Sequence, residues 1–423
     1  MKRLLPLYLA IFVGFIAYSI QIPIFTSLFL EREYGPDIFS NTPHDLRRLI
    51  LGLLLSMYPL GQFLGSSIIG AFSDRFGRKK LILFSLIMTI LSTMAAALCI
   101  QSASIVLLHL SLFSAGFFEG NIAIAQGAIV DCIDDANRSR YFGYIYVGSS
   151  LGFIGGPLLA SFFSNPHFVS WFAPSTSFWL VIILMAILTF WIFFHFKETH
   201  IPNGHTKRAF FQAFTNIGNV FRDRNLRYYY AVNFLIYFSL FGFLRIYPTF
   251  VTVKFKIDFG VLSMIVAYVS LPFVVVNLFL TPLFSKLRAP KQITMIFSIL
   301  MGFSMISIVL FPQFNALWFT LAITTFCLAV VNTFSAAMIS FMADREYQGS
   351  VMGNNQSLVS GAQGVSAILG GALATIVAFL PLVFFGILAI IAGIMLFRRG
   401  HIEWQRDPSY HAPPVVRKDD ESY

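Results

Sequence analysis

Long apolar runs dominate this chain of 423 residues. Runs of 18 or more residues recur from one end to the other, and a run of that length can cross the hydrocarbon core of a bilayer. Twelve such spans are predicted, over residues 5–29, 47–72, 81–101, 104–130, 142–164, 177–197, 227–250, 259–284, 292–311, 316–341, 351–378 and 381–398.

The small number of charges also indicates a membrane environment. Only 11% of the residues are Asp, Glu, Lys or Arg, whereas about a quarter is usual in a soluble domain. A span exposed to lipid must satisfy its own backbone hydrogen bonds, so these runs should be helices. A barrel is not expected, because barrel strands alternate apolar and polar residues in short segments. The predicted fold class is therefore an all-α, multi-pass integral membrane protein.

Basic residues in the loops predict the orientation. Of the 29 Lys and Arg, 23 fall on the side of the two termini, five fall on the opposite side, and Arg245 lies inside a span. Because cytoplasmic loops carry the excess of Lys and Arg, both termini are predicted to be cytoplasmic. The net charge of +10 then serves insertion and attraction to anionic lipid. Membrane lipid is thus an expected partner, and nucleic acid is not.

The spans divide into two sets of six, separated by one long basic linker. We expect an N-terminal six-helix bundle (1–197), a cytoplasmic linker with an interfacial helix (198–226), a C-terminal six-helix bundle (227–398) and a cytoplasmic tail (399–423). The hydropathy pattern repeats weakly between the halves, so the bundles should be pseudo-symmetric. Such duplication is typical of transporters whose solute site lies between the repeats, near the bilayer midplane.

The stretch GAFSDRFGRKK joins the second and third spans. The excess of bases on the cytoplasmic side accounts for its Lys and Arg but not for its aspartate. Close approach of a helix and a tight turn would need its two glycines. The ordered series resembles the signature loop of the major facilitator superfamily, and this resemblance implies that superfamily's fold of two six-helix bundles. The residues that carry it are Gly70, Asp74, Arg75, Gly77 and Arg78.

Two further motifs resemble the drug/proton antiporter branch of the superfamily, and the tetracycline/proton antiporters in particular. One is GFIGGPLLAS in the fifth span, with Gly152, Gly156 and Pro157; the other is KET, residues 197–199.

The chain also departs from that branch at two positions. Leu112 stands where an arginine is usual, and Gly14 stands where the tetracycline exporters carry an aspartate. Both missing groups are tied to proton coupling or substrate binding in the family. Tetracycline is therefore not the expected substrate, and the coupling site must have moved or been lost.

Glu119 lies midway along the fourth span. A charge at that depth costs about 2.5–3.5 kcal/mol on insertion scales, so it is a functional candidate. It follows Leu112 by seven residues, which is almost the same helix face. If the family's arginine faces the central cavity, a carboxyl at Glu119 could gain and lose a proton as access to water alternates. Glu119 is the predicted proton-coupling residue; a carboxyl that only joins helices, and a contact to a cationic substrate, remain alternatives.

Arg245 lies in the outer third of the seventh span. An arginine fork in a cavity suits a carboxylate or phosphate on a substrate. The alternative is a side chain that snorkels to the outer interface. A direct pair with Glu119 is not expected, because the estimated depths of the two residues differ by about 10 Å.

Polar side chains elsewhere complete the candidate sites. In the superfamily's topology the first, fourth, seventh and tenth spans surround the substrate, and the candidates on them are Tyr18, Gln21, Asn233, Tyr237 and Asn332. At the cytoplasmic end of the fourth span, an acid such as Asp131 is expected to bridge to Arg75 or Arg78. Together with the loop of residues 70–80, it would form a conformational latch between the halves.

The sequence thus indicates a monomeric secondary active transporter of a bacterial inner membrane, with a small-molecule substrate and protons as partners. The leading hypothesis is proton-coupled export of an amphipathic compound. One alternative is import of an anionic organic solute, such as a carboxylate-rich metabolite or a siderophore; another is a transport-inactive receptor or scaffold. The sequence carries no nucleotide-binding glycine loop and no catalytic or metal-binding pattern, so no enzyme activity, cofactor or metal is expected.

Overall fold

The computed structural model describes most of the apolar part of the chain and little of the linker and tail. The described residues are 4–30, 43–120, 124–125, 128–129, 138–166, 168–199, 224–281, 283, 289–311, 313–341 and 348–398.

Twelve long helices build the described part of the chain. Six precede the linker: α1 (Leu5–Leu30), α2 (His44–Phe76), α3 (Arg78–Gln101), α4 (Ile105–Phe118), α6 (Arg138–Phe163) and α7 (Thr176–His195). Six follow it: α9 (Arg224–Phe255), α10 (Phe259–Val275) with the π-helical turn η2 (Val276–Leu280), α12 (Pro290–Leu310), α13 (Phe314–Phe341), α14 (Gln348–Ile376) and α15 (Leu380–Arg398). The described residues contain no strand, and the prediction of an all-α membrane fold is confirmed.

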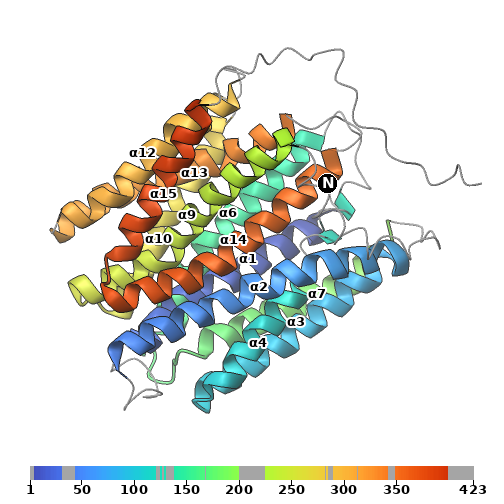
Figure 1. The fold of residues 1–423 in the computed structure, drawn as a ribbon. Helices are drawn as coiled ribbons and strands as arrows, with labels where there is room; N and C mark the ends of the chain where they lie inside the picture. The colour runs from blue at the N-terminus through green and yellow to red at the C-terminus, as the bar shows by residue number, and fades with distance from the viewer. Residues whose placement is uncertain are drawn as a thin grey trace, which may run out of the picture.

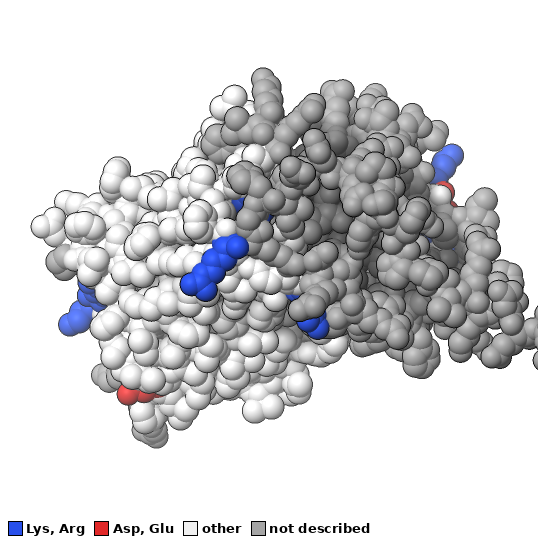
Figure 2. Space-filling view, turned by 45° about the horizontal axis from the view of Figure 1, so that its top comes forward, with Lys and Arg blue, Asp and Glu red and all other residues white. Residues whose placement is uncertain are grey.

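The helices have the length and the surface that a bilayer requires. Ten are long and apolar enough to cross a membrane, and α4 and the Val147–Phe163 part of α6 are shorter apolar helices. Large apolar side chains lie exposed on their outer faces, such as Ile187 and Phe190 of α7 and Phe303 of α12. Charged residues are few and isolated on the described part of the face in Figure 2. Such a surface is suited to lipid rather than to water.

The helix α4 is interrupted within the predicted span 104–130, and the described residues 124–125 and 128–129 are helical again. It stops at Phe118, and Glu119 forms its C-cap. The Glu119 backbone N–H is shared between the carbonyls of Ala115 and Gly116, at 3.0 and 3.2 Å, and the Phe118 carbonyl accepts a hydrogen bond from the Ser85 hydroxyl. Because a side chain of α3 satisfies this helix end, the chain can leave the helix there without an orphaned backbone group.

A tight turn joins α2 to α3 at the end of the bundle that carries the N-terminus, here named the terminal end. Gly77 adopts φ +99°, a conformation that glycine alone adopts readily. The carboxylate of Glu198, from the KET motif, then accepts hydrogen bonds from the first two N–H groups of α3, those of Arg78 (2.8 Å) and Lys79 (3.1 Å). A negative charge at a helix N-terminus is stabilising, so Glu198 anchors this turn.

The buried apolar residues form two large clusters. Apart from Phe259 and Ala367, the first draws its members from residues 4–196; apart from Ile22, the second draws them from residues 229–396. Figure 1 shows α2, α3, α4 and α7 on one side, α9, α10, α12, α13 and α15 on the other, and α1, α6 and α14 between them. The predicted linker and tail lie almost wholly outside the described residues, so their boundaries stay a prediction.

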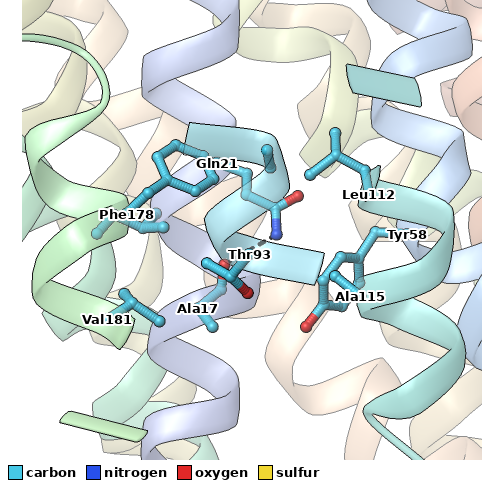
Figure 3. Close-up of a pocket in the computed structure, with 10 residues that line it drawn as sticks. Ala17, Gln21, Tyr58, Thr93, Leu112, Ala115, Phe178 and Val181 are labelled. Atoms are coloured by element: carbon cyan, nitrogen blue, oxygen red, sulfur yellow. Dashed lines mark hydrogen bonds between the residues drawn. The ribbon is translucent and has the colours of Figure 1, made fainter. Parts of the chain in front are cut away.

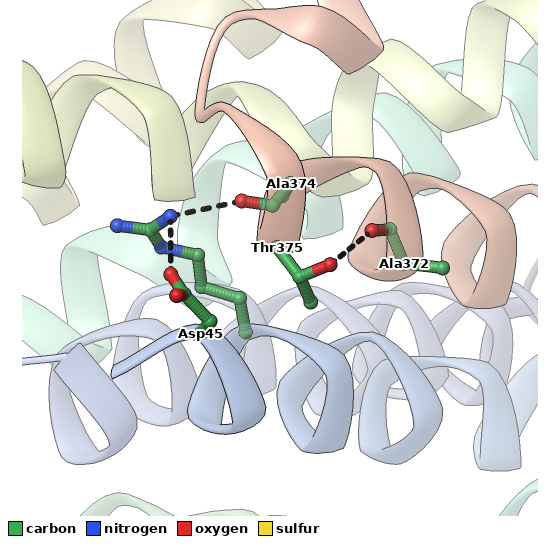
Figure 4. A network of polar contacts seen from close by, with 5 residues as sticks. Asp45, Ala372, Ala374 and Thr375 are labelled. Atoms are coloured by element: carbon green, nitrogen blue, oxygen red, sulfur yellow. Dashed lines mark hydrogen bonds and ion pairs between the residues drawn. The ribbon is translucent and has the colours of Figure 1, made fainter. Parts of the chain in front are cut away.

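Two helix pairs join the halves at the end away from the N-terminus, here named the distal end. The first pair is α2 and α14. A Cβ at Gly52 would lie only 2.7 Å from the Cα of Gly371, so the two backbones touch. Nearby, Nη1 of Arg48 donates to the Ala374 carbonyl (2.9 Å) and pairs with Asp45 (3.2 Å), as Figure 4 shows. The distal ends of α2 and α14 are therefore in close contact.

The second pair is α6 and α10. The Ser270 hydroxyl donates to the Phe153 carbonyl (3.4 Å), and Nδ2 of Asn277 donates to the Ser150 hydroxyl (3.3 Å). Closer to the distal end, the Cβ position of Gly260 lies 3.7 Å from Nδ2 of Asn165. Contact between the halves thus extends from the distal end to the middle of the bundle.

Candidate functional site

The site is built on a crossing of α2 and α4 through two pairs of glycines. A glycine pair four residues apart lies within α2, and a second pair lies at the end of α4 and just beyond it; this spacing lets two membrane helices approach closely. A Cβ at Gly61 would meet the backbone of Phe113, and one at Gly65 would meet the backbone of Phe117. The reverse contacts come from α4 and the turn after it: a Cβ at Gly116 of α4 would meet the backbone of Tyr58, and one at Gly120, two residues beyond α4, would lie 3.1 Å from the Gly65 carbonyl.

This crossing brings Tyr58 and Gln62 of α2 beside Glu119. The Glu119 side chain is 1% exposed. Its Oε2 accepts a hydrogen bond from Nε2 of Gln62 (3.3 Å), and its Oε1 has no hydrogen-bond partner among the described residues. The Tyr58 hydroxyl lies within electrostatic reach of the carboxyl but makes no hydrogen bond of good geometry with it. Glu119 is thus a buried carboxyl with one amide donor, one nearby hydroxyl and no ion pair within the described chain.

Arg245 of α9 turns inward, contrary to the snorkelling alternative. The residue is 2% exposed, and its guanidinium carbon lies 4.5 Å from the centre of the Tyr18 ring, a cation–π contact. Its Nη2 has no hydrogen-bond partner among the described residues. Counted along the helices at 1.5 Å per residue, Arg245 lies about 15 Å and Glu119 about 21 Å from the distal end. No ion pair joins these two residues in the described structure.

Tyr18 of α1 connects these groups. Its hydroxyl donates to Oε1 of Gln363 on α14 (2.9 Å). Its ring meets the rings of Tyr58 and Phe153 edge-on, with centroids 5.5 Å apart in both pairs. One aromatic side chain therefore links the neighbour of Glu119 to Arg245 and ties the first half to the second. We name the following six residues the central cluster: Tyr18, Tyr58, Gln62, Glu119, Arg245 and Gln363.

Gln21 lies outside the central cluster. Its Nε2 donates to the Ala17 carbonyl (2.9 Å), and the side chain points into a small cavity within the first half, shown in Figure 3. This cavity also touches Tyr58 and Leu112. Its volume is about 10 Å³, which is room for roughly one water molecule. Gln21 is therefore placed to bind a water near Tyr58 and does not join Tyr18 or Arg245.

The three remaining predicted substrate residues lie on α9 (Asn233 and Tyr237) and α13 (Asn332). Nδ2 of Asn233 donates to Oδ1 of Asn355 (2.5 Å). The Tyr237 hydroxyl donates to the Asn332 carbonyl (3.3 Å) and accepts from Ser335 (3.1 Å). None of these hydrogen bonds reaches the central cluster, so the structure places Asn233, Tyr237 and Asn332 apart from Tyr18 and Arg245.

The motif of residues 70–80 is described only in part. Gly77 and Glu198 form the turn, and Nη1 of Arg78 donates to the Ser73 hydroxyl (2.6 Å). No described atom lies within 4 Å of a Cβ placed at Gly70, so the close helix approach expected there involves no described residue and stays a prediction. The side chains of Asp74 and Arg75, and Asp131 altogether, lie outside the described residues.

The glycine–proline motif serves the contact between α6 and α1. A Cβ at Gly152 would lie 2.6 Å from the Phe12 carbonyl, and one at Gly156 would lie 2.8 Å from the Ile16 carbonyl. The Ser19 hydroxyl donates to the Gly152 carbonyl (3.2 Å). With Pro157 on the same helix, the motif lets α6 support the α1 backbone next to Tyr18.

The sequence analysis does not identify three members of the central cluster, namely Tyr58, Gln62 and Gln363. The paired glycines GQFLG and GFFEG carry a readable signal for the first two, because they predict a close crossing that would place Tyr58 and Gln62 near Glu119. No comparable pattern marks Gln363, whose helix is rich in small and polar residues throughout.

Comparison with known proteins gives one family. A family model described as "Major Facilitator Superfamily" matches residues 7–353 and 229–419.

Among curated relatives, the chain is similar to "Tetracycline resistance protein, class B" of Escherichia coli, with 29% identity over 155 residues, or 37% of this chain. That match covers only 36% of the tetracycline protein's length. It is also similar to "Multidrug resistance protein 2" of Bacillus subtilis (strain 168), with 24% identity over 394 residues, covering 90% of this chain and 91% of that protein.

Among solved structures, the human organic anion transporter MFSD10 (TETRAN) resembles the chain with a TM-score of 0.70 and 19% identity, over 93% of this chain and 99% of that one. At this identity the likeness concerns the fold alone. The family and the names of the relatives indicate a transporter rather than an enzyme.

Proposed function

Because this chain belongs to the Major Facilitator Superfamily, we propose that it is a proton-coupled secondary transporter that exports an amphipathic solute by alternating access. One observation carries the proposal. Glu119 is buried in the middle of the bundle, has one unoccupied carboxyl oxygen, and has no cationic partner among the described residues. Such a carboxyl can bind a proton from one side of the membrane and release it to the other.

The neighbours of Glu119 suggest how a proton acts there. A charged carboxylate away from water accepts hydrogen bonds from the donors around it, since an unpaired buried charge is costly in free energy. The Gln62 amide already donates to it, and the Tyr58 hydroxyl would rotate to do so. A protonated, neutral carboxyl no longer needs a hydrogen bond from the Tyr58 hydroxyl, so Tyr58 can move away from it. Because the Tyr58 ring packs against Tyr18, the change reaches the Tyr18–Gln363 hydrogen bond between the halves.

Alternating access would come from rocking the two predicted six-helix bundles, 1–197 and 227–398. The separate hydrophobic clusters of the two halves support this division, because each could move as a packed unit. Contacts between α2 and α14 at Gly52 and Gly371 support a conformation that is closed at the distal end. The loop of residues 70–80, with Asp131, would latch the terminal end in the opposite state.

Export is supported by the similarity to proteins named for tetracycline and multidrug resistance. The glycine–proline motif in α6 is consistent with that direction. The proposed setting is a monomer in a bacterial inner membrane with both termini in the cytoplasm, as the distribution of Lys and Arg predicts.

A second candidate function is import of an anionic organic solute. The observation that favours it is Arg245, a buried guanidinium without a counter-ion among the described residues. The two candidates share the same site and the same family, and they differ in the direction of movement.

Transport by everted membrane vesicles tests the proposal. The vesicles are given an imposed pH gradient, acidic inside, and a panel of amphipathic cations, neutral compounds and carboxylates that mass spectrometry quantifies. We expect gradient-dependent accumulation of at least one compound by the wild type and by Glu119→Asp, which keeps the carboxyl. Glu119→Gln should lose it. Accumulation without a gradient, or an unaffected Glu119→Gln, would contradict proton coupling at this residue, and accumulation only under the reverse gradient would favour import.

A further inference from the structure

The Arg245 guanidinium lies in the centre of the bundle without an anion to neutralise it among the described residues. It is 2% exposed, and its Nη2 has no hydrogen-bond partner among the described residues. An unpaired charge at such depth is strongly unfavourable unless a function requires it. Glu119 forms no ion pair with Arg245 among the described residues; the two groups are linked only indirectly, through contacts of Arg245 with Tyr18, of Tyr18 with Tyr58 and of Tyr58 with Glu119.

The surroundings hold this guanidinium in one position. Its face lies over the Tyr18 ring. That ring is itself fixed by the hydrogen bond from its hydroxyl to Gln363 and by edge-on contacts with Tyr58 and Phe153. A guanidinium stacked in this way can still donate in its own plane, and its planar fork matches a carboxylate. The unpartnered Nη2 is therefore an oriented donor with no acceptor among the described residues.

We infer that the transported solute carries a carboxylate that binds Nη2 of Arg245, next to an aromatic or similarly flat apolar body that packs against Tyr18 and Phe153. Phe153 is only partly buried and packs edge-on against Tyr18, so its ring offers an apolar surface next to the ring that Arg245 covers. This inference rests on the proposed transport function and names the class of solute for the same site, whichever way the solute moves.

Binding of two matched probes tests the inference without a proton gradient. Purified full-length protein in phosphatidylcholine nanodiscs is titrated with 2-naphthoate and with 2-naphthamide, which has the same rings and no charge. We expect 2-naphthoate to bind at least about tenfold more tightly, the value of one charge-assisted hydrogen bond. Equal affinity, including no detectable binding of either probe, would overturn the inference.

Variants locate the preference at Arg245. Arg245→Gln should lose the preference for 2-naphthoate, Arg245→Lys should retain part of it because the charge remains without the fork, and the exposed Arg398→Gln should behave as wild type. A folded Arg245→Gln protein that still prefers 2-naphthoate would refute the assignment. If that variant does not fold, the comparison of the two probes on wild type, together with Arg245→Lys, still decides.

A lipid headgroup could present the same anionic chemistry as a solute. Nanodiscs that also contain phosphatidylglycerol separate the two sources. Unchanged binding of 2-naphthoate supports a solute site, whereas loss of binding would show that the site takes a headgroup and would overturn the inference. Since these titrations need no gradient, their failure would leave proton-driven transport through Glu119 untouched, and failure of proton coupling would leave them untouched.

Discussion

The contact between Gly52 of α2 and Gly371 of α14 predicts that one added methyl group opens the distal end. In Gly52→Ala, the new Cβ would lie 2.7 Å from the Ala367 carbonyl and 2.7 Å from the Cα of Gly371. Ordinary contact begins at 3.4 Å, so the two helices must separate by about 0.7 Å or distort. Both neighbours are backbone atoms, which cannot rotate away as a side chain can.

The penalty falls on the closed state alone. Overpacking of this kind costs about 1–3 kcal/mol. In a state where α2 and α14 have separated at the distal end, the methyl group contacts no atom of the other helix and carries no free-energy penalty. The ratio of distal-open to distal-closed protein should therefore rise about 5–150-fold, since a perturbation shifts an equilibrium by its difference between the two states.

Pulsed electron–electron double resonance, which measures the distance between two spin labels, reports the ratio of distal-open to distal-closed protein. Spin labels are placed at Ser102, after α3, and at Gln313, before α13, which are exposed at the distal end on opposite halves. The three native cysteines are replaced by serine. We expect the wild type to show mainly the shorter distance and Gly52→Ala to gain a longer one.

Two other glycines on the same helices provide the controls. At Gly70 of α2 and Gly361 of α14, no described atom lies within 4 Å of the position that an alanine Cβ would occupy, so alanine at either should not increase the longer distance. The reasoning is refuted if Gly52→Ala leaves the distance distribution unchanged, or if Gly70→Ala or Gly361→Ala opens the distal end as much.

Three further predictions follow from single contacts. Glu198→Ala removes the acceptor for the first N–H groups of α3 and should lower stability by about 1 kcal/mol, as loss of a helix cap does; a thermal unfolding midpoint equal to that of wild type would contradict this role. Tyr18→Phe keeps the ring under Arg245 but loses the hydrogen bond to Gln363, worth about 1 kcal/mol. Thermal stability and transport should therefore fall, while 2-naphthoate should still bind more tightly than 2-naphthamide. Loss of that preference would show that the hydroxyl itself binds solute. Gly116→Ala forces α4 away from the Tyr58 backbone, so it should lower the free energy of unfolding by about 1–3 kcal/mol and reduce proton-driven accumulation of solute. Gly361→Ala is the control for both measurements. Unchanged stability and transport in Gly116→Ala would argue against the close crossing.

The sequence predicts the helices well because hydropathy and length decide them. The predicted 177–197 and 381–398 differ from α7 and α15 by at most two residues at each end, and the resemblance to the superfamily and its antiporter branch is confirmed by the matches to known proteins. The interruption after Phe118 within the span 104–130 is missed, since Ser85 of another helix satisfies the Phe118 carbonyl there.

Glu119 and Arg245 stand out in the sequence because a charge within an apolar run is rare. Which helix face a neutral polar residue occupies is set by packing, and a list of spans does not contain it. Gln21, Asn233 and Tyr237 therefore lie apart from the central cluster although they are on helices expected to line the site. Gln363, on a helix not expected to line it, joins the cluster through Tyr18.

The most direct test of proton coupling at Glu119 is proton movement driven by solute. Proteoliposomes containing pyranine, a pH-sensitive dye, are given an outward gradient of the compound that the vesicles accumulate most strongly. Wild type and Glu119→Asp should change the internal pH as the compound moves, and Glu119→Gln should not. If Glu119→Gln changes the internal pH as much as wild type, the proton is carried elsewhere and the account of this site is wrong.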